Sequence, residues 1–321
     1  MNIISVKNLK KVYGDFTAVD GISFDIAQGE AFGFLGPNGA GKTSTINMLT
    51  GLSRPTAGTI RIDGIDGIKK IKKAQSIMGI VPDESNLYDE MNGFDNLTFC
   101  AALYGMGKAE RQKRAAELLE EFNLKEAGDR PFKAYSKGMR RKLTIAAGII
   151  HRPKILFLDE PTTGIDVESA RQIRRLLSDL KRQGVTIFLT THYIEDAQRI
   201  CDRIAFIVKG RIVKSGTVDE LLRNAGQEQV IRLTLSQGIK GIKNQFQQAF
   251  PALRIEAQSE NDCLITAPER IALAPILQYL DSKGISVFEA KEARPTLEDV
   301  FVKVTGIEAG KPHKEKAGEH R

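Results

Sequence analysis

A run of glycines followed by a lysine and a threonine has the spacing of a phosphate-binding loop. Residues 36–43 read GPNGAGKT, which fits G-x-x-x-x-G-K-[S/T], and they follow the apolar run 31–35. Glycines let such a loop curl so that its backbone N–H groups point at phosphate oxygens. Lys42 can then reach the β- and γ-phosphates, and the Thr43 hydroxyl can bind Mg²⁺. We therefore predict a nucleoside triphosphate site, contacted by Gly36, Pro37, Asn38, Gly39, Ala40, Gly41, Lys42, Thr43 and Ser44.

Two adjacent carboxylates could act on such a ligand. Asp159 and Glu160 end the apolar run 155–158, which is typical of a strand. The carboxyl end of this strand in a parallel sheet would lie beside the phosphate loop. There Asp159 can hold Mg²⁺ through water, and Glu160 can polarise the water that attacks the γ-phosphate. The alternative, an exposed turn after a strand, is disfavoured by the phosphate loop upstream.

A third segment could meet an anion at the end of a helix. Ser136 precedes a basic stretch and then an apolar helical pattern, so its side chain is well placed to cap that helix. The first backbone N–H groups and the dipole of the helix would then face an anion. By itself this pattern is a weak signal.

The elements that must position these residues alternate between strand and helix up to about Leu222. This alternation predicts an α/β domain over residues 1–224, with a largely parallel sheet covered by helices on both faces. The predicted strands are 31–35, 77–81, 155–158, 185–189 and 204–208. Between residues 93 and 151 the pattern is helical, most clearly at 115–122, which indicates an inserted helical subdomain.

A second unit is predicted after the turn-rich residues 224–226. We expect a small α+β domain over residues 225–307, of the split-βαβ kind. Its predicted strands are 229–235, 253–257, 263–266 and 285–288, and its predicted helices are 239–250, 270–282 and 297–304. The tail 308–321 is rich in Lys, Glu, Gly and His and is expected to be disordered.

The composition limits where such a protein could work. The chain of 321 residues has a formal net charge of +7, and its basic residues fall in short pairs such as 140–141 and 174–175, which we interpret mainly as solvated faces. No apolar run approaches the roughly 20 residues that span a bilayer, and the N-terminus lacks a secretory signal. The three cysteines are widely spaced and predict neither disulfides nor a zinc site. We expect a cytosolic protein.

The order of the motifs resembles that of the ATP-binding subunits of ABC transporters, over roughly residues 3–222. The segments that carry this resemblance are the phosphate loop, the helical block, the Ser136 helix, the Asp159–Glu160 pair, PTTGID at 161–166 and TTH at 190–192. The resemblance implies a P-loop NTPase of the ABC ATPase kind that hydrolyses Mg-ATP. It also implies that two copies pair head to tail, with ATP bound between them.

Several residue roles follow from the resemblance alone. Ser136 and Gly138 would cover the γ-phosphate bound by the other copy, and Asp166 would belong to the loop that crosses the dimer interface. His192 resembles the switch histidine that hydrogen-bonds the γ-phosphate and the attacking water, and Tyr13 resembles the aromatic residue that stacks on adenine. Glu160, His192 and Lys42 are thus the predicted catalytic residues, and Thr43, Asp159 and Asp83 the predicted Mg²⁺ ligands.

Two positions depart from the usual family pattern. Asp83 follows Val81-Pro82 where the family usually has glutamine, so it adds negative charge while still offering an oxygen to Mg²⁺ or water. The signature reads YSKGM at 135–139 instead of LSGGQ, which places the Lys137 cation near the opposite γ-phosphate. Both changes could alter turnover or coupling to a membrane partner.

The C-terminal residues indicate which kind of ABC ATPase the chain resembles. Residues 294–301, RPTLEDVF, resemble the C-terminal extension of separately encoded ATPases of type-2 exporters, including daunorubicin-resistance and sodium-efflux-like systems, although they could be no more than a capped helix. We expect a homodimer at the inner face of the cell membrane, bound to an integral membrane permease that holds the transported substrate. The alternatives are an importer subunit and a soluble ABC ATPase acting on nucleic acid or the ribosome. No nucleic-acid partner is expected, because the long coiled-coil and zinc insertions of DNA-repair relatives and the fused domains of translational relatives are missing from the sequence. A GTPase would need an Asn-Lys-x-Asp motif, which the sequence also lacks.

Overall fold

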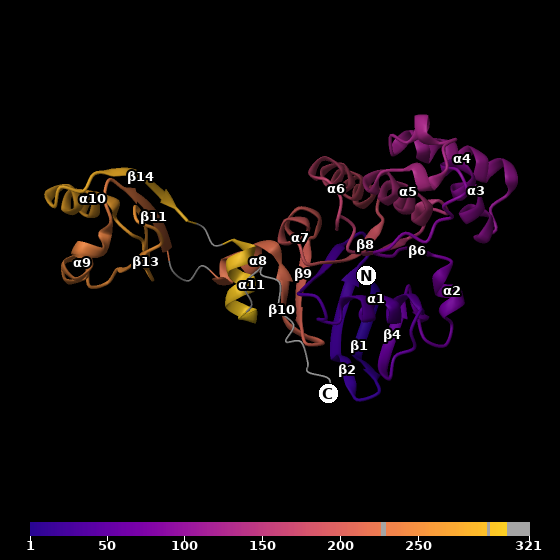
Figure 1. Cartoon of the computed structure of the whole chain (residues 1–321). Helices are drawn as coiled ribbons and strands as arrows, with labels where there is room; N and C mark the ends of the chain where they lie inside the picture. The colour runs from indigo at the N-terminus through magenta and orange to yellow at the C-terminus, as the bar shows by residue number, and fades with distance from the viewer. Residues whose placement is uncertain (226–228, 294–295, 307–321) are drawn as a thin grey trace, which may run out of the picture. The chain divides into compact units, whose positions relative to one another are not determined.

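A computed structural model describes residues 1–225, 229–293 and 296–306, and the chain divides into two compact units, Met1–Val218 and Asp219–Arg321 (Figure 1). The division falls at the start of helix α8 (Val218–Ala225), whereas the boundary we predicted lies near its other end. The predicted disordered tail, 308–321, lies outside the described residues. Within the described ranges, every helix is too short or too polar to cross a lipid bilayer.

The larger sheet of the first unit has the strand order β10-β9-β3-β8-β7-β6. Its strands are β3 (Ala31–Leu35), β6 (Met78–Val81), β7 (Ile155–Asp159), β8 (Thr186–Thr191), β9 (Arg203–Val208) and β10 (Arg211–Thr217). All neighbours pair in parallel except β10, which is antiparallel to β9. Every residue of β3, β7 and β8 is buried, as expected for strands covered on both faces. The predicted strands of this sheet are confirmed, with small shifts at their ends.

Helices pack on both faces of this sheet. Helix α1 (Lys42–Thr50) shares a hydrophobic core with β3, β7 and β8 on one face. On the other face α5 (Lys137–Ile149) contacts β6, and α6 (Val167–Arg182) and α7 (Ile194–Ile200) contact β8. Ser136 caps α5 and Asp166 caps α6, each accepting a hydrogen bond from a backbone N–H in the first turn. These two caps fix where both helices begin.

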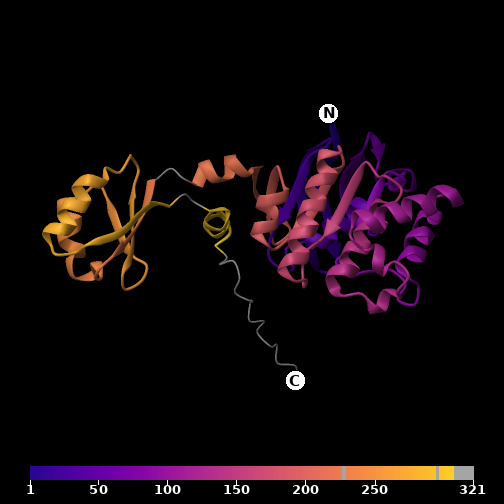
Figure 2. The same cartoon turned by 90° about the horizontal axis from the view of Figure 1, so that it is seen from above.

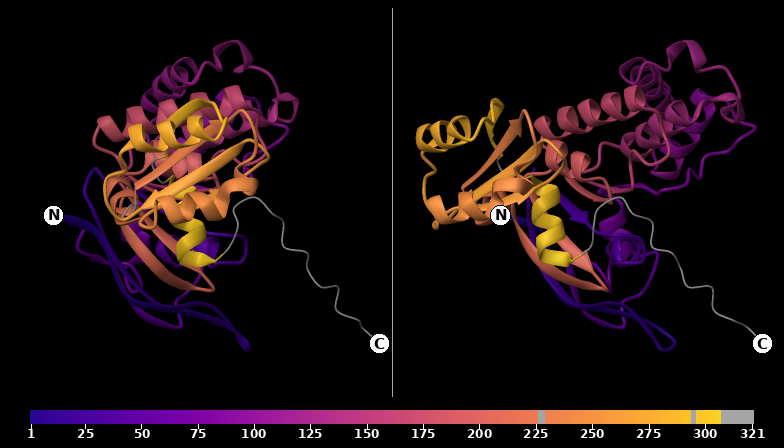
Figure 3. Two further views of the ribbon diagram at one scale, coloured as in Figure 1. Left: turned by 90° about the vertical axis from the view of Figure 1, so that its left-hand side faces the viewer. Right: turned by 60° about the vertical axis from the view of Figure 1, so that its left-hand side comes forward.

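The predicted helical subdomain is present between β6 and β7. Helices α3 (Gly93–Leu103) and α4 (Lys108–Glu121) pack against each other and both contact α5. Figures 1 and 3 show α3 and α4 side by side at one edge of the first unit. Asn92 caps α3 by accepting a 2.7 Å hydrogen bond from the N–H of Asp95. The short helix α2 (Ile71–Gln75) lies upstream of β6.

A second sheet in the first unit was not predicted. It is antiparallel, in the order β2-β1-β4-β5, and consists of β1 (Asn2–Tyr13), β2 (Phe16–Ala27), β4 (Ala57–Ile62) and β5 (Ile65–Asp66). Repeated register shifts between β1 and β2 interrupt the alternation of buried and exposed residues on which a strand prediction depends. Phe24 of β2 packs on Phe32, Phe34 and Phe188, so the two sheets share one core.

The second unit is built around an antiparallel sheet in the order β12-β13-β11-β14. Its elements are β11 (Gln229–Leu235), a 3₁₀ turn (Ile239–Ile242), α9 (Lys243–Ala249), β12 (Arg254–Ala257), β13 (Asp262–Ala267), α10 (Leu273–Ser282), β14 (Val287–Glu292) and α11 (Leu297–Thr305). Figure 2 shows α9 and α10 on the same side of the sheet. This is the predicted split-βαβ arrangement. The predicted last strand, 285–288, is placed too early, because buried Ile285 precedes a strand whose residues are mostly exposed.

Helix α11 begins where the sequence indicates. Thr296 accepts a hydrogen bond from the N–H of Asp299, and the Asp299 carboxylate accepts one from the N–H of Thr296. This reciprocal pair is a capping box, which satisfies two donors that the helix itself leaves free.

Candidate active site

The predicted phosphate loop connects the end of β3 to the start of α1, in the middle of the larger sheet. Two of its glycines are required by close packing. A Cβ on Gly36 would lie 2.2 Å from the carbonyl oxygen of Ile207. Gly41 has a φ of 102°, and a Cβ there would lie 2.5 Å from the carbonyl oxygen of Ala18. Any larger residue at either position would therefore displace backbone.

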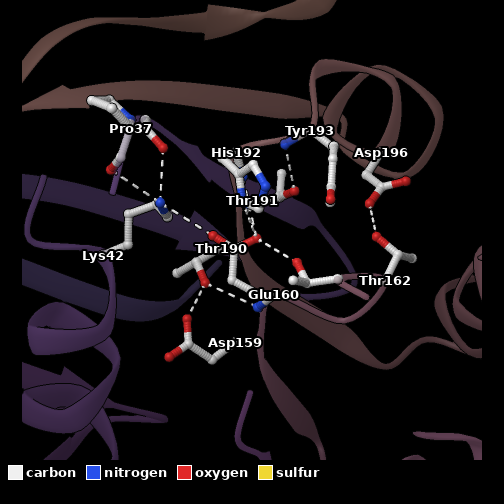
Figure 4. Close-up of polar contacts among 12 residues, drawn as sticks. Pro37, Lys42, Asp159, Glu160, Thr162, Thr190, Thr191, His192, Tyr193 and Asp196 are labelled. Atoms are coloured by element: carbon white, nitrogen blue, oxygen red, sulfur yellow. Dashed lines mark hydrogen bonds and ion pairs between the residues drawn. The ribbon is translucent and has the colours of Figure 1, made fainter. Parts of the chain in front are cut away.

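Lys42 is buried at the mouth of this loop. Its Nζ donates hydrogen bonds to the carbonyl oxygens of Gly36 (2.7 Å) and Pro37 (3.2 Å) and lies 3.1 Å from Glu160 Oε1 (Figure 4). The first intrahelical hydrogen bond runs from the Thr45 N–H to the Gly41 carbonyl. The N–H groups at the start of α1 precede that bond and are available to an anion.

Glu160 follows β7 and is contacted from three directions. Besides Lys42, it accepts hydrogen bonds at Oε2 from His192 Nδ1 (2.9 Å) and Thr163 Oγ1 (3.2 Å), and the backbone N–H of His192 points at the same oxygen (3.3 Å). Burial favours a higher pKa for Glu160, but the His192 hydrogen bond and the Lys42 charge outweigh it and lower the pKa. The carboxylate is therefore ionised at neutral pH.

The backbone of Glu160 is held in the left-handed region, with φ at 48°. A non-glycine residue in this region costs about 1–2 kcal/mol, and such strain is commonly found at functional sites. The strand end is fixed by its neighbour Thr190, whose carbonyl accepts the Glu160 N–H at 3.1 Å. Thr190 Oγ1 also donates to Asp159 Oδ1, so one threonine on β8 holds the Asp159 carboxylate and the backbone of Glu160.

The predicted Mg²⁺ ligands differ in their surroundings. Asp159 is 5% exposed, whereas Thr43 at the start of α1 is exposed. The described residues contain no cluster of three or more His, Cys, Asp or Glu side chains arranged to hold a metal. A hydroxyl and carboxylate oxygens are nevertheless donors that suit Mg²⁺, which usually takes one or two carboxylates and completes its shell with water and phosphate oxygens.

Asp83 lies two residues beyond β6, in the segment that we call the switch loop (residues 82–85). Partial burial raises its pKa; among the charged neighbours, Arg141 acts in the opposite direction, and the carboxylates of Asp159 and Glu160 raise it further. These influences place Asp83 in the electrostatic environment of the Asp159–Glu160 pair.

Ser136, Gly138 and Asp166 make their described contacts away from the Lys42–Glu160–His192 cluster. Ser136 Oγ accepts the N–H of Met139 at 3.2 Å, as predicted for a cap. A Cβ on Gly138 would lie 2.2 Å from Ser169 Oγ, so close packing of α5 on α6 already explains this glycine. The Asp166 carboxylate accepts hydrogen bonds from Ser169 N (2.8 Å) and Oγ (2.7 Å). Their roles across a dimer stay predictions.

Tyr13 lies at the end of β1, and its side chain is not part of the core. Tyr13 is 47% exposed as a residue, Lys11 Nζ lies 4.6 Å from the ring centroid, and the hydroxyl is 3.5 Å from Ser53 Oγ. An exposed aromatic face of this kind is able to stack on a planar base.

Sequence reasoning missed two buried networks around these residues. Arg141, read as part of a solvated basic pair, is 7% exposed and hydrogen-bonds backbone carbonyls of the switch loop and of the β7 end. Asp196 on α7, 1% exposed, accepts hydrogen bonds from Thr162 Oγ1 and, at 2.7 Å, from Arg174 Nε. No pattern in the local sequence marks Arg141, because its acceptors lie 18 to 59 positions away along the chain.

Comparisons with known proteins agree with this geometry. The family model described as ABC transporter matches residues 19–163. The daunorubicin/doxorubicin resistance ATP-binding protein of Streptomyces peucetius is 36% identical over 98% of this chain and 96% of its own length. The Nod factor export ATP-binding protein I of Ralstonia nicotianae is 36% identical over 95% of this chain and 94% of its own length. A dimeric post-hydrolysis structure of an ATP-binding cassette bound to ADP and Pi superimposes with a TM-score of 0.62 and 26% identity, covering 67% of this chain and 98% of that one.

Proposed function

The chain belongs to the ATP-binding subunits of ABC transporters, of the exporter kind, and from that premise we propose how its residues bind and hydrolyse Mg-ATP. It is an ATPase that energises transport. The observation that supports the mechanism best is the chain of contacts from Lys42 to Glu160 to His192 at the carboxyl end of the sheet (Figure 4).

ATP is bound by its phosphates at the start of α1. Free backbone N–H groups of the loop and of the first turn of α1 surround the phosphate oxygens, and Lys42 exchanges its contacts with Gly36 and Pro37 for the β- and γ-phosphates. The exposed ring of Tyr13 stacks on adenine. Thr43 and Asp159, with Asp83 from the switch loop, would hold Mg²⁺, which supplies positive charge that neutralises the phosphate oxygens.

Hydrolysis depends on Glu160. Its carboxylate is ionised and accepts a proton from, or orients, the water that attacks the γ-phosphate. His192 holds that carboxylate through two hydrogen bonds, and in the closed state it hydrogen-bonds the γ-phosphate and the attacking water. Lys42, at 3.1 Å from Glu160, stabilises the charge that develops on the phosphate.

The complete site needs a second copy of the chain. We place Ser136 and Gly138 at the first turn of α5 over the γ-phosphate of the partner, with Lys137 adding a cation, and the 163–166 loop with Asp166 at the interface. The dimeric state of the ADP-bound cassette that resembles this chain supports a homodimer. Two-fold symmetry would give two equivalent composite sites. ATP binding closes this dimer, and hydrolysis reopens it.

The subunit acts together with a separate membrane permease. The relative from Ralstonia nicotianae is named for export, and that from Streptomyces peucetius for drug resistance, which supports a location at the cytoplasmic face of a membrane. The permease binds the transported substrate, and the helical block between Asp83 and Tyr135 carries the groove for a coupling helix of the permease. We expect no nucleic-acid partner. The 225–307 domain is an accessory domain of the exporter type.

The substitution Glu160→Gln tests the catalytic assignment. It keeps the size and hydrogen-bonding ability of the side chain but removes the proton acceptor, so steady-state ATP hydrolysis should fall by about 10²–10⁴-fold. The variant should still bind ATP and form an ATP-dependent dimer in size-exclusion chromatography. Glu168→Gln, the same change at an exposed position on α6 (62% exposed side chain), is the matched control and should hydrolyse ATP normally. Wild-type turnover by Glu160→Gln would contradict the assignment.

The transport assignment has its own test. Tagged Glu160→Gln protein is purified with Mg-ATP from gently solubilised native cells, and the proteins that accompany it are identified. We expect a multi-helix membrane protein. Ribosomes or nucleic acid without a permease would leave the ATPase in place and refute the exporter, in favour of a soluble ABC ATPase.

A further inference from the structure

Arg141 is a buried cation that contacts only backbone oxygens among its described hydrogen-bond partners. Its side chain lies on α5, with 7% of the residue exposed. Nε donates to the carbonyl oxygen of Pro161 at 2.9 Å, and Nη2 donates to that of Asp159 at 2.6 Å. Nη1 donates to the carbonyl oxygens of Pro82 and, at 3.0 Å, of Asp83. One planar guanidinium thus connects three segments that are distant in the sequence.

The environment keeps this cation charged. Burial lowers the pKa of Arg141 to about 10, while the carboxylates of Asp83, Asp159 and Glu160 act to raise it. Charged donors form stronger hydrogen bonds than neutral ones, and removing a buried charge that is fully bonded leaves its partners unsatisfied. Four carbonyl oxygens, from Pro82, Asp83, Asp159 and Pro161, accept hydrogen bonds from this one side chain.

The position of these carbonyls is informative, because two of them flank Glu160. The peptide oxygens of Asp159 and Pro161 are the ones immediately before and after the proposed base, and both are attached to α5. The switch loop is attached to the same helix by a further contact, a 2.8 Å hydrogen bond between Ser85 Oγ and Thr144 Oγ1. A displacement of α5 would therefore carry both the switch loop and the backbone of Glu160 with it.

We infer that Arg141 is a positioning residue for ATP hydrolysis, which couples the signature helix α5 and the switch loop to the orientation of Glu160. The inference rests on the proposed function, since it concerns the same site. Arg141 has no described contact with the phosphate loop, so we expect its substitution to change the chemical step far more than the affinity for ATP. An arginine is required because its fork of N–H groups reaches oxygens on both sides of Glu160, which a single ammonium does not.

The substitution Arg141→Lys tests this by keeping the charge and losing the fork. We expect the full-length variant to bind a fluorescent ATP analogue within about twofold of wild type, while kcat falls by about 10- to 100-fold, the size of a misplaced catalytic group. Arg140→Lys is the matched control. Arg140 is the adjacent residue, and it bonds the carbonyls of Lys133 and Tyr135 in the helical subdomain, so kcat should change less than twofold.

A second measurement separates positioning from general structural damage. In single-turnover hydrolysis, adding Arg141→Lys or Arg141→Gln to Glu160→Gln should cause almost no further loss, because Arg141 acts through Glu160. Three results would each overturn the inference. The first is that the losses in rate from the two substitutions add in full. The others are a kcat of Arg141→Lys within twofold of wild type, and a parallel loss of ATP binding and kcat. If the wild type and Arg141→Lys hydrolyse ATP equally fast, the inference fails but the proposed function stands. If the wild type does not hydrolyse ATP at all, both fail.

Discussion

Replacing Gly138 by alanine tests whether this glycine is fixed by packing within one chain. The added methyl would lie 2.2 Å from Ser169 Oγ and 2.7 Å from Ser169 Cβ, whereas ordinary van der Waals contact begins near 3.4 Å. Ser169 would have to move by more than about 1 Å, and it is held by two hydrogen bonds to Asp166, at 2.7 and 2.8 Å. Overpacking of this kind costs about 1–3 kcal/mol of unfolding free energy.

Urea unfolding of the full chain, followed by far-ultraviolet circular dichroism, measures this cost for the first unit. In a thermal unfolding experiment on a domain of about this size, each kcal/mol of lost stability lowers Tm by roughly 2–4 °C. Ser169→Gly removes both clashing atoms, so the double variant should recover a coupling free energy of about 1–2 kcal/mol relative to the sum of the single changes. If Gly138 also approaches the γ-phosphate of a partner, the double variant will recover stability without recovering ATP hydrolysis.

Two results would refute this reasoning. An unfolding free energy of Gly138→Ala within about 0.5 kcal/mol of wild type would mean that α5 and α6 adjust freely. Equal destabilisation of the single and double variants would mean that Ser169 is not the obstacle. In either case the glycine would have to be explained by the dimer alone.

Three further changes have defined outcomes. Tyr13→Ala should weaken ATP binding by about 1–3 kcal/mol, measured by isothermal titration, and Tyr13→Phe should bind normally, because stacking needs only the ring. Asp196→Ala should lower the unfolding free energy, measured in urea, by about 3–5 kcal/mol, because it breaks a buried ion pair and removes the acceptor of the Thr162 hydroxyl. The exposed control Asp281→Ala should change it by less than about 0.5 kcal/mol. Burial lowers the pKa of His151 from its ordinary 6.5, despite its hydrogen bond to the Met78 carbonyl. Below pH 6.5 the unfolded chain therefore binds more protons than the folded protein, and the folded protein loses stability as the pH falls. Unfolding at several pH values should show this loss in wild type and not in His151→Gln; equal pH dependence in both would contradict it.

Contiguous motifs predicted their own local structure, because a few neighbouring residues decide the backbone there. The phosphate loop, the strand ending in Asp159 and Glu160 and the Ser136 cap lie where we predicted. The contact between His192 and Glu160 links residues 32 positions apart and was not predicted, because the family resemblance assigned His192 only to the γ-phosphate and the attacking water. Periodicity alone would have left this histidine at an ordinary strand end.

Residues whose role depends on distant partners were harder to predict. Arg141 looks like a surface residue in a basic pair, and its four acceptors are main-chain oxygens 18 to 59 positions away. The antiparallel sheet was missed for a different reason, since its register shifts remove the two-residue period. In both cases tertiary packing decides the structure, and it leaves little mark on the local sequence.

The choice of main-chain oxygens as the partners of Arg141 has a consequence for how this protein can evolve. A carbonyl is present whatever the side chain, so residues 82, 83, 159 and 161 can be exchanged without removing an acceptor. The switch loop can therefore change its chemistry, from an amide to the carboxylate of Asp83, while its attachment to α5 is inherited unchanged. A change of side chain at position 83 therefore leaves the hydrogen bonds between the switch loop and Arg141 of α5 in place.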